Sequence, residues 1–564
     1  MRNLFIVNAV KLVLAVVTGV LAAGCSTLDV KSHYAAHSPQ QALSADYYQI
    51  EIPTHDGLYL RATLYQPQLA PGETAPVIIH AHGFGTFRAP RPMSLYGKWI
   101  LSGKAAIAAW ENKYWMISYD QRGFGDSDGK VHIMDPDYEV KDVSSIIDWV
   151  EANLPQVSRD NNGDLLLGMV GESYGGGAQL LASVFDKRID AIVPLTTWHN
   201  LAESIAPNGH VKAAWAAILA GAGIFSSVFD FDKMLAPPYI TLLNGKMNVA
   251  ATVELERRSL STYCAQNRYP QADMLLLQGF RDTVFPVNQG YKNWQCAKEA
   301  GLDARLVAIQ GGHILPWPLQ SWSGLPFYNT EDEIQCGNYR QPATKMIVDF
   351  FDEKLKQKRP SQVVPELCVT VADGEGMIAQ DIPLGGMPLD LQEAELGLIH
   401  SGWFEVILQP VDRLMGLVWS RNNQESDLAE VSGGTIRPAF KPLVQIMQPV
   451  PLVGFPQIDL TVETSDDDQE ATVFIGVGVR KAGEYTVELV SEQLTPLPGD
   501  GHYKMPIAAV SLDLQPGDQV GLVMQGFSGQ YFWNPEGWFE SAKLVGKVDL
   551  PINQAMTEFR VANH

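Results

Sequence analysis

Residues 165–182 read LLLGMVGESYGGGAQLLA, and this stretch decides the fold. The apolar run 165–170 predicts a buried strand, and the small and apolar residues 176–182 predict the start of a helix. Between them Ser173 stands in a Gly-x-Ser-x-Gly turn, whose flanking glycines suit a strained and crowded backbone. The stretch therefore predicts a strand, a sharp turn that carries a serine, and a helix.

Other apolar runs of similar length alternate with helical stretches along the chain. This alternation is typical of a mostly parallel sheet that is covered on both faces. Residues 342–358 have apolar side chains at helical spacing and predict a closing amphipathic helix, and residues 47–66 alternate about Asp56-Gly57 and predict a hairpin. The strand-like runs are 77–81, 115–119, 165–170, 191–195, 274–277 and 306–309.

Two chemically active side chains follow later strands. Asp282 comes shortly after the run 274–277, and His313 comes shortly after the run 306–309. The order serine, aspartate, histidine, each just beyond an apolar strand, is the order that an α/β-hydrolase triad requires. We predict Ser173 as nucleophile, His313 as the base that takes its proton, and Asp282 as the acid that fixes the histidine tautomer.

The sequence His80-Ala81-His82-Gly83-Phe84 ends an earlier strand and predicts an oxyanion loop. The backbone N–H of Phe84, together with that of Tyr174, would stabilise the negative oxygen that forms when the serine attacks a carbonyl. His82 could be taken for the base, but its place before Gly83 favours a role in organising the loop.

Two polar segments are interpreted as structural. Residues 120–127, DQRGFGDS, would stabilise a loop through Asp120 and Arg122 hydrogen bonds. Residues 160–164, DNNGD, superficially suggest calcium, but no properly spaced glutamate follows, so a turn is favoured. The sequence predicts no metal site and no cofactor.

The remaining chain divides by pattern. Residues 200–269 break the strand and helix order and contain an apolar stretch, 213–229, that favours a cap over the sheet more than a second membrane segment. After Pro360 strict alternation predicts an antiparallel β-sandwich, as in 458–462, 473–479, 510–514 and 520–524. The predicted parts are a signal peptide (1–24), a tether (25–44), an α/β domain (45–358) and a sandwich domain (359–564).

The N-terminal residues resemble a bacterial lipoprotein signal. Arg2 and Lys11 precede an apolar stretch that ends in Ala22-Ala23-Gly24-Cys25. The resemblance implies that the mature chain begins at a lipidated Cys25, anchored in the bacterial cell envelope on the periplasmic side or at the outer membrane. A plain cleaved signal peptide and an N-terminal transmembrane helix remain alternatives, although the apolar run is short for a span.

The composition of the chain indicates which kinds of binding partner are excluded. The net charge of −22 argues against nucleic acid, which requires clustered Lys and Arg. In an oxidising compartment the four remaining cysteines, Cys264, Cys296, Cys336 and Cys368, can form disulfides, and three pairings are open. The oligomeric state is not predicted.

Together these motifs resemble the acyl esterase and X-Pro dipeptidyl-peptidase (S15-like) group of α/β hydrolases, which includes cocaine esterase. The resemblance rests on the hairpin at Asp56-Gly57, the Gly-x-Ser-Tyr-Gly turn, Asp282 and His313. It implies an α/β-hydrolase fold with a helical cap that shapes the pocket and a C-terminal jelly-roll-like sandwich. Members often have a tyrosine in the oxyanion loop, where this chain has Phe84, so backbone donors would have to suffice.

The expected function is hydrolysis of a small ester or amide through an acyl-enzyme on Ser173. The first alternative is an X-Pro dipeptidyl aminopeptidase, which must recognise a free amino terminus; Glu203, Asp230 and Asp232 are acidic groups in the cap that could do so. The second is a non-catalytic surface protein that binds through the sandwich.

Overall fold

The computed structural model describes residues 34–213, 215–216, 219, 245–313, 333–372, 375–398, 429–431, 438–465, 471–526, 528, 530–531 and 540–552. The predicted signal peptide, Cys25, Asp230, Asp232 and nearly all of the apolar stretch 213–229 lie outside these residues.

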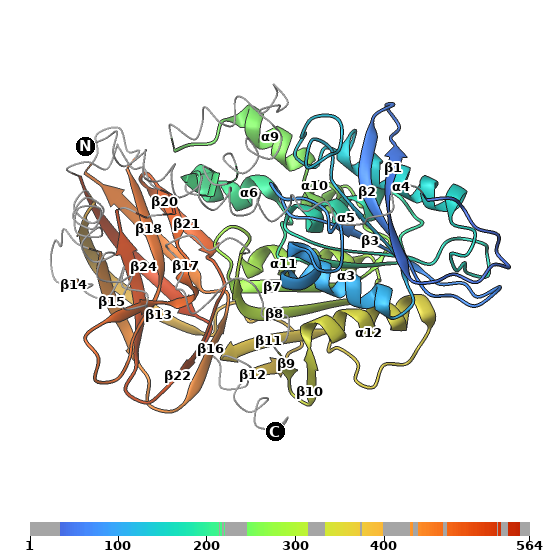
Figure 1. Cartoon of the computed structure of the whole chain (residues 1–564). Helices are drawn as coiled ribbons and strands as arrows, with labels where there is room; N and C mark the ends of the chain where they lie inside the picture. Colours follow the sequence, from blue (N-terminus) through green and yellow to red (C-terminus); the bar gives the residue numbers. More distant parts are fainter. Residues whose placement is uncertain are drawn as a thin grey trace.

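A ten-stranded sheet forms the centre of the larger part of the molecule (Figure 1). Its order is β1-β2-β4-β3-β5-β6-β7-β8-β11-β12, and the strands from β4 to β11 run parallel. The predicted hairpin is present as the antiparallel pair β1 and β2. The strands are β1 (Asp46–Pro53), β2 (Tyr59–Gln66), β3 (Val77–Ala81), β4 (Trp115–Tyr119), β5 (Leu167–Glu172), β6 (Ala191–Leu195), β7 (Asp273–Arg281), β8 (Ala304–Gly312), β11 (Leu367–Ala372) and β12 (Glu375–Ile378).

Helices cover both faces of this sheet, because alternate residues of each central strand are apolar and buried on opposite sides. In β3, for example, Ile78 packs in the cluster that contains α3 and α12, whereas Ile79 packs in the cluster that contains α4 and α5. The helices are α2 (Leu95–Trp99), α3 (Leu101–Glu111), α4 (Glu139–Asn153), α5 (Tyr174–Phe185), α6 (Leu201–Ile205), α9 (Val249–Arg257), α10 (Leu260–Ala265), α11 (Val287–Glu299) and α12 (Ala343–Lys356), with short 3-10 turns η1 (Pro207–Gly209) and η4 (Val490–Glu492).

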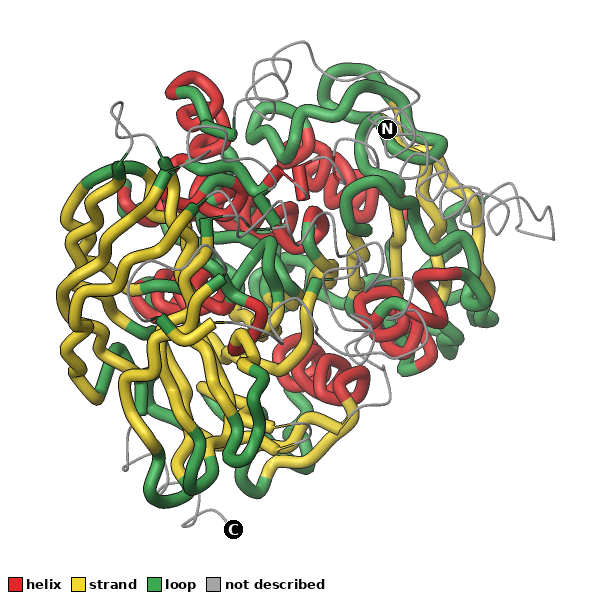
Figure 2. Tube along the Cα trace, turned by 90° about the vertical axis from the view of Figure 1, so that its left-hand side faces the viewer, coloured by secondary structure: helices red, strands yellow, loops and turns green. Residues whose placement is uncertain are grey.

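Antiparallel sheets build the second part, which faces the viewer in Figure 2. A four-stranded sheet (β13-β24-β17-β21) and a six-stranded sheet that contains β15, β23 and β18 share one apolar core, as the alternating pattern predicts. The strands are β13 (Met387–Gly397), β14 (Ala429–Glu430), β15 (Ala439–Gln445), β16 (Val450–Gly454), β17 (Gln457–Thr464), β18 (Thr472–Arg480), β19 (Val487–Leu489), β20 (Thr495–Pro498), β21 (Gly501–Pro506), β22 (Val510–Leu514), β23 (Gln519–Gln525) and β24 (Ser541–Leu550); β9 (Glu333–Cys336) and β10 (Tyr339–Pro342) form a separate hairpin.

The large sheet ends later in the chain than the boundary expected at 358/359. β11 and β12 lie beyond that boundary, yet β11 pairs in parallel with β8. The sequence does not show to which sheet such a strand belongs. A short buried strand has the same apolar pattern whether it is the last strand of one sheet or the first strand of the next.

The structure selects one of the three cysteine pairings. Cys264 bonds to Cys296, which links α10 to α11, and Cys336 bonds to Cys368, which links β9 to β11. Both bonds therefore lie in the part of the molecule built on the large sheet.

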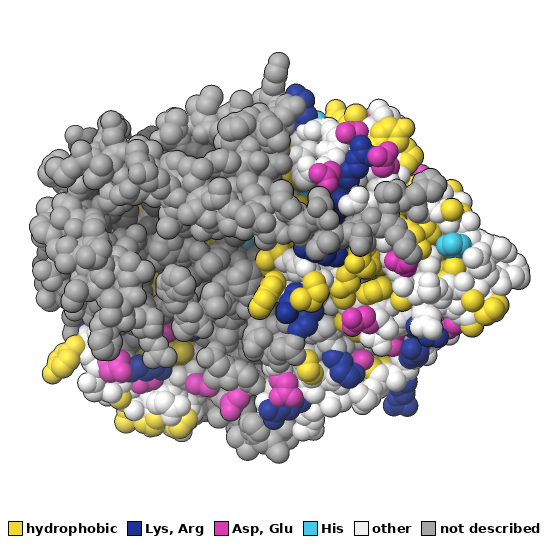
Figure 3. Space-filling model, viewed as in Figure 1, with side chains coloured by type: hydrophobic (Ala, Val, Ile, Leu, Met, Phe, Trp, Pro, Cys, Tyr) yellow, Lys and Arg dark blue, Asp and Glu magenta, His cyan; other side chains and the backbone are white. Residues whose placement is uncertain are grey.

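Among the described residues, no helix is both long and apolar enough to cross a membrane. On the described part of the face in Figure 3, Lys and Arg side chains are interspersed with Asp and Glu.

His80, in β3, predicts a pH dependence of stability. Its ring nitrogens bond the hydroxyls of Ser118 (2.9 Å) and Ser102 (3.1 Å), and burial lowers the pKa of His80 to about 3. Between pH 6.5 and 3 the unfolded chain takes up a proton that the folded chain does not. The free energy of unfolding therefore decreases as the pH is lowered through this window. From pH 7 to pH 4 we expect wild type to lose about 3 kcal/mol more of its unfolding free energy than His80→Gln, measured by urea denaturation. Parallel pH curves for the two proteins would contradict this.

Candidate active site

Ser173 stands at the turn between β5 and α5, with a backbone φ of +52°. This conformation is uncommon for a residue other than glycine and marks local strain. The turn passes close to β3, because a Cβ added to Gly175 would lie 2.1 Å from the Ala81 carbonyl oxygen. Gly171 is similarly confined, which explains the two glycines of the motif.

Asp282 follows β7 and His313 follows β8, at the same edge of the sheet as Ser173. His313 Nε2 lies 3.1 Å from Ser173 Oγ, and His313 Nδ1 lies 2.9 Å from Asp282 Oδ2. Asp282 is fully buried, and its other oxygen accepts the backbone N–H groups of Val284 (3.0 Å) and Phe285 (2.8 Å). The structure thus brings the three predicted residues into one hydrogen-bonded array.

Two aromatic side chains hold the imidazole in place. Trp215 and Phe285 both contact the ring of His313 in edge-to-face geometry, with centroids 5.4 and 5.2 Å away. Trp215 Nε1 in turn donates to Thr283 Oγ1 at 2.9 Å. The region predicted as a cap therefore reaches the array through Trp215.

Lys212, in the same region, donates from Nζ to the Val284 carbonyl at 3.3 Å. Burial lowers the pKa of Lys212 to about 8, against the attraction of Asp282. A buried amine thus lies beside the acid loop, which we define as residues 279–285.

The two expected oxyanion donors lie on adjacent segments. The ring of Phe84 contacts that of Tyr174 at a centroid distance of 5.2 Å, so the loop after β3 packs against the start of α5. The first turn of a helix has backbone N–H groups without intrahelical partners. Within the described part of the chain, neither the Phe84 N–H nor the Tyr174 N–H has a hydrogen-bond acceptor, as the predicted role of these two groups requires.

The Tyr174 side chain does not replace the tyrosine that is absent from the oxyanion loop. Its hydroxyl accepts the backbone N–H of Met134 at 2.9 Å and lies 3.3 Å from Glu139 Oε1. Ile133 and Met134 both have positive φ, 55° and 59°, which is uncommon for such side chains. The hydroxyl therefore anchors a strained loop.

Glu172 joins the nucleophile turn to the oxyanion loop. Its buried Oε1 accepts the Gly83 N–H at 2.9 Å and the Tyr96 hydroxyl, and Oε2 accepts the Ser102 hydroxyl. Burial raises the pKa of Glu172. Since Gly83 precedes Phe84, this carboxyl group ties the start of the loop that contains Phe84 to the turn that contains Ser173.

We therefore expect Glu172→Ala to lower kcat roughly 10²-fold, the cost of losing one oxyanion donor, with KM little changed. Glu172→Gln keeps a carbonyl acceptor for Gly83 and should retain most of the activity. Steady-state kinetics on the purified variants measures both effects. Equal activity of the alanine variant and wild type would show that Glu172 does not orient the loop.

His82 and Asp120 have the structural roles expected of them. His82 Nε2 accepts the Gln121 N–H at 3.0 Å, so it braces the loop and does not reach Ser173 as a base. Asp120 accepts the backbone N–H groups of Arg88 (2.7 Å) and Asp126 (3.0 Å).

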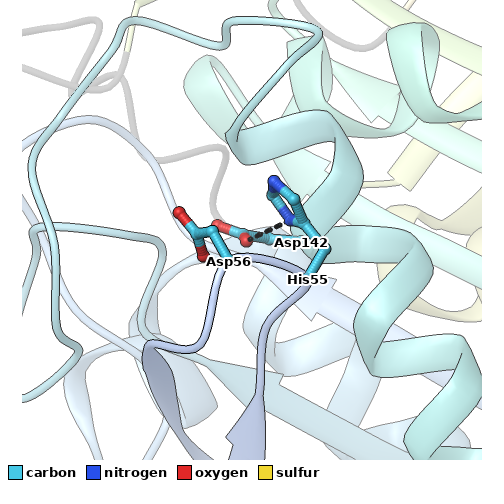
Figure 4. Close-up of side chains that lie close together, drawn as sticks. All are labelled: His55, Asp56 and Asp142. Carbon is cyan, nitrogen blue, oxygen red and sulfur yellow. Dashed lines mark ion pairs between the residues drawn. The ribbon is translucent and has the colours of Figure 1, made fainter.

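One cluster contains the residue types that commonly bind a metal ion. Ligand atoms of His55, Asp56 and Asp142 all lie within 4.8 Å of one another (Figure 4). Arg122 already bonds both carboxylates, at 2.5 Å from Asp56 Oδ2 and 2.6 Å from Asp142 Oδ1. These bonds hold the pKa of Asp56 well below its usual range, and a guanidinium thus supplies the positive charge that a metal ion would bring.

Other candidates are not part of the array. Glu203 forms an ion pair with Lys292 at 2.8 Å, and Asp160 accepts the N–H groups of Asn162 and Asp164 in an exposed turn. Sequence reasoning missed Glu172, Lys212 and Trp215. Glu172 stood inside the quoted motif, and a charged residue in a buried turn was the available signal.

Residues 56–228 match the family model of X-Pro dipeptidyl-peptidase (S15 family). Among solved structures, an α-amino acid ester hydrolase superposes with a TM-score of 0.61 at 15% identity, covering 94% of this chain and 99% of the other. A CocE/NonD family hydrolase from Staphylococcus aureus gives a TM-score of 0.61 at 13% identity, again over 94% and 99%. The predicted resemblance to the S15 group is therefore confirmed over residues 56–228, and the α/β-hydrolase fold with a sandwich is confirmed as well.

Curated relatives match a shorter part of this chain. An uncharacterized 31.7 kDa protein of Escherichia coli is 34% identical over 118 residues, which are 21% of this chain and 36% of the relative. The thiohydrolase aneE of Aspergillus aculeatus is 26% identical over 148 residues, 26% of this chain and 40% of the relative. The chain thus spans less than half the length of these relatives.

Proposed function

We propose that the chain is a serine hydrolase that cleaves ester or amide bonds through an acyl-enzyme on Ser173. The observation that carries the proposal is the pair of hydrogen bonds that join His313 with Ser173 (3.1 Å) and with Asp282 (2.9 Å). A hydroxyl, an imidazole and a buried carboxylate in this order are what covalent acyl transfer requires.

In the first half-reaction His313 Nε2 takes the Ser173 hydroxyl proton as Oγ attacks the substrate carbonyl carbon. The C=O electron pair moves to the oxygen, which the Phe84 and Tyr174 N–H groups stabilise. The imidazolium is stabilised by Asp282 and gives its proton to the leaving group as the C–O or C–N bond breaks. Water then attacks the acyl-enzyme by the same route, and the acid product leaves with Ser173 restored.

Small esters are the proposed substrates, and X-Pro peptides are the second candidate because the matching family model is described by that activity. The Glu203–Lys292 ion pair weighs against the second candidate, since it neutralises one carboxylate that would bind a free amino terminus. Initial rates on nitrophenyl acetate and butyrate, compared with Gly-Pro nitroanilide, test the choice. Turnover of the anilide alone would reverse the order, and turnover of none would favour a binding protein.

We also propose that the chain is exported and anchored in the cell envelope by lipid on Cys25. Support comes from the sequence Ala22-Ala23-Gly24-Cys25 after an apolar stretch, and from four cysteines that pair as two disulfides. Wild type expressed in a bacterium should partition into detergent and incorporate labelled palmitate, whereas Cys25→Ser should do neither. Equal palmitate labelling of the two proteins would refute lipidation at this residue.

A further inference from the structure

Gln493 belongs to the sandwich part of the molecule, yet its side chain reaches the acid loop. It follows η4, and its Nε2 donates to the carbonyl oxygens of Phe280 (2.8 Å) and Asp282 (3.0 Å). The side chain is buried, with 4% of its surface exposed. More than two hundred residues separate the partners in sequence, so this contact exists only because the sandwich docks here.

The backbone before Gln493 adopts an unusual path. Ser491 and Glu492 both have left-handed φ, 58° and 57°, without being glycine. Such residues persist where the surrounding structure fixes them, and they are enriched at functional sites. Here Ser491 is held by the Ser511 N–H, which donates to Ser491 Oγ at 3.2 Å.

The α/β part and the cap region hold other positions of the acid loop. Trp215 bonds Thr283, Lys212 bonds the Val284 carbonyl, and Gln278 bonds the Phe285 carbonyl. The backbone at Asp282 itself is bonded by Gln493. The placement of Asp282 Oδ2 against His313 therefore depends on a residue of the sandwich.

We propose that Gln493 is a positioning residue for the triad, so that the sandwich completes the catalytic apparatus in addition to any role in binding. The inference deepens the proposed function and rests on it. Displacement of the acid loop by a fraction of an ångström weakens the bond between Asp282 and His313, and the imidazolium that forms during attack is then less stable.

Gln493→Met removes the amide donor at nearly constant volume and tests the proposal on the full-length protein with a nitrophenyl ester. We expect kcat to fall roughly 10- to 100-fold, as expected for a small misplacement, with KM within about 2-fold of wild type. Among the described residues, Arg281 and Asp282 are the charged groups of the acid loop, Lys212 bonds this loop, and Asp282 bonds His313. Because a displaced Asp282 stabilises the imidazolium less, the acidic limb of the kcat/KM profile should shift to lower pH.

Ser511→Ala is the matched control, because alanine keeps the backbone N–H that donates to Ser491 Oγ. Ser511 Oγ also crosses between the two parts, donating to the Thr370 carbonyl at 2.6 Å, but it does not touch the acid loop. We expect this variant to keep kcat within about 2-fold and to leave the pH profile unchanged. Gln493→Asn, whose amide is one methylene short, serves if the methionine variant fails to fold, and should give a smaller loss in the same direction.

Equal kcat and an unshifted profile for the Gln493 variants and Ser511→Ala would overturn the inference. Failure of the proposed function gives a different result, since wild type itself would then show no turnover that depends on Ser173. An active wild type with unaffected Gln493 variants would thus reject only the role of Gln493.

Discussion

Ser173→Ala is expected to abolish turnover. Without Oγ no acyl-enzyme forms, and kcat/KM should fall at least about 10⁴-fold, as for nucleophile deletions in other serine hydrolases. Initial rates on a nitrophenyl ester measure the loss, with circular dichroism to confirm folding. The fold should persist because alanine removes only the hydroxyl.

The matched control for this loss is Ser183→Ala, on α5, the helix that follows Ser173. Ser183 is fully buried and donates to the Leu180 carbonyl at 2.8 Å, so its removal tests the loss of a buried hydroxyl without touching His313. It should keep activity within a few-fold of wild type. Comparable activity of Ser173→Ala and Ser183→Ala would exclude Ser173 as the nucleophile.

Asp282→Asn is expected to lower kcat roughly 10⁴-fold, by analogy with the same change in a serine protease. The asparagine oxygen would keep the Val284 and Phe285 N–H groups, which leaves its amide group facing His313. That amide donates where the carboxylate accepted, so it favours the wrong histidine tautomer. Steady-state kinetics between pH 6 and 9 measures the loss.

Asp160→Asn provides the comparison for a change of carboxylate to amide in an exposed turn, and it should leave kcat unchanged. If Asp282→Asn kept most of the wild-type kcat, the acid would have to be another residue.

The sequence predicted the array because each of its members follows an apolar strand of a parallel sheet. Strand runs and turn glycines are local signals, and parallel strands bring their carboxyl ends to one edge. Ser173, Asp282 and His313 could therefore be placed together without knowledge of packing. The supporting residues of the cap region and the sandwich could not be predicted. Trp215 and Gln493 come close to these three residues only when distant parts of the chain pack together, and no sequence periodicity indicates that packing.

The domain boundary and the disulfide pairing could not be predicted from the sequence for a related reason. The apolar sequence of β11 would suit a strand of the large sheet or a strand of the sandwich. Only its pairing with β8 assigns β11 to the large sheet. The partners of Cys264 and Cys336 depend on which elements become neighbours in space. Glu172 lay within the motif itself, but its function depends on Gly83 and Tyr96, which come from distant segments.

Covalent labelling with a fluorophosphonate, followed by peptide mapping, tests the central claim most directly. The account predicts one adduct per folded chain, on the peptide that contains Ser173, and its loss in His313→Ala. A folded wild-type protein that forms no adduct, or forms one on another residue, would contradict it.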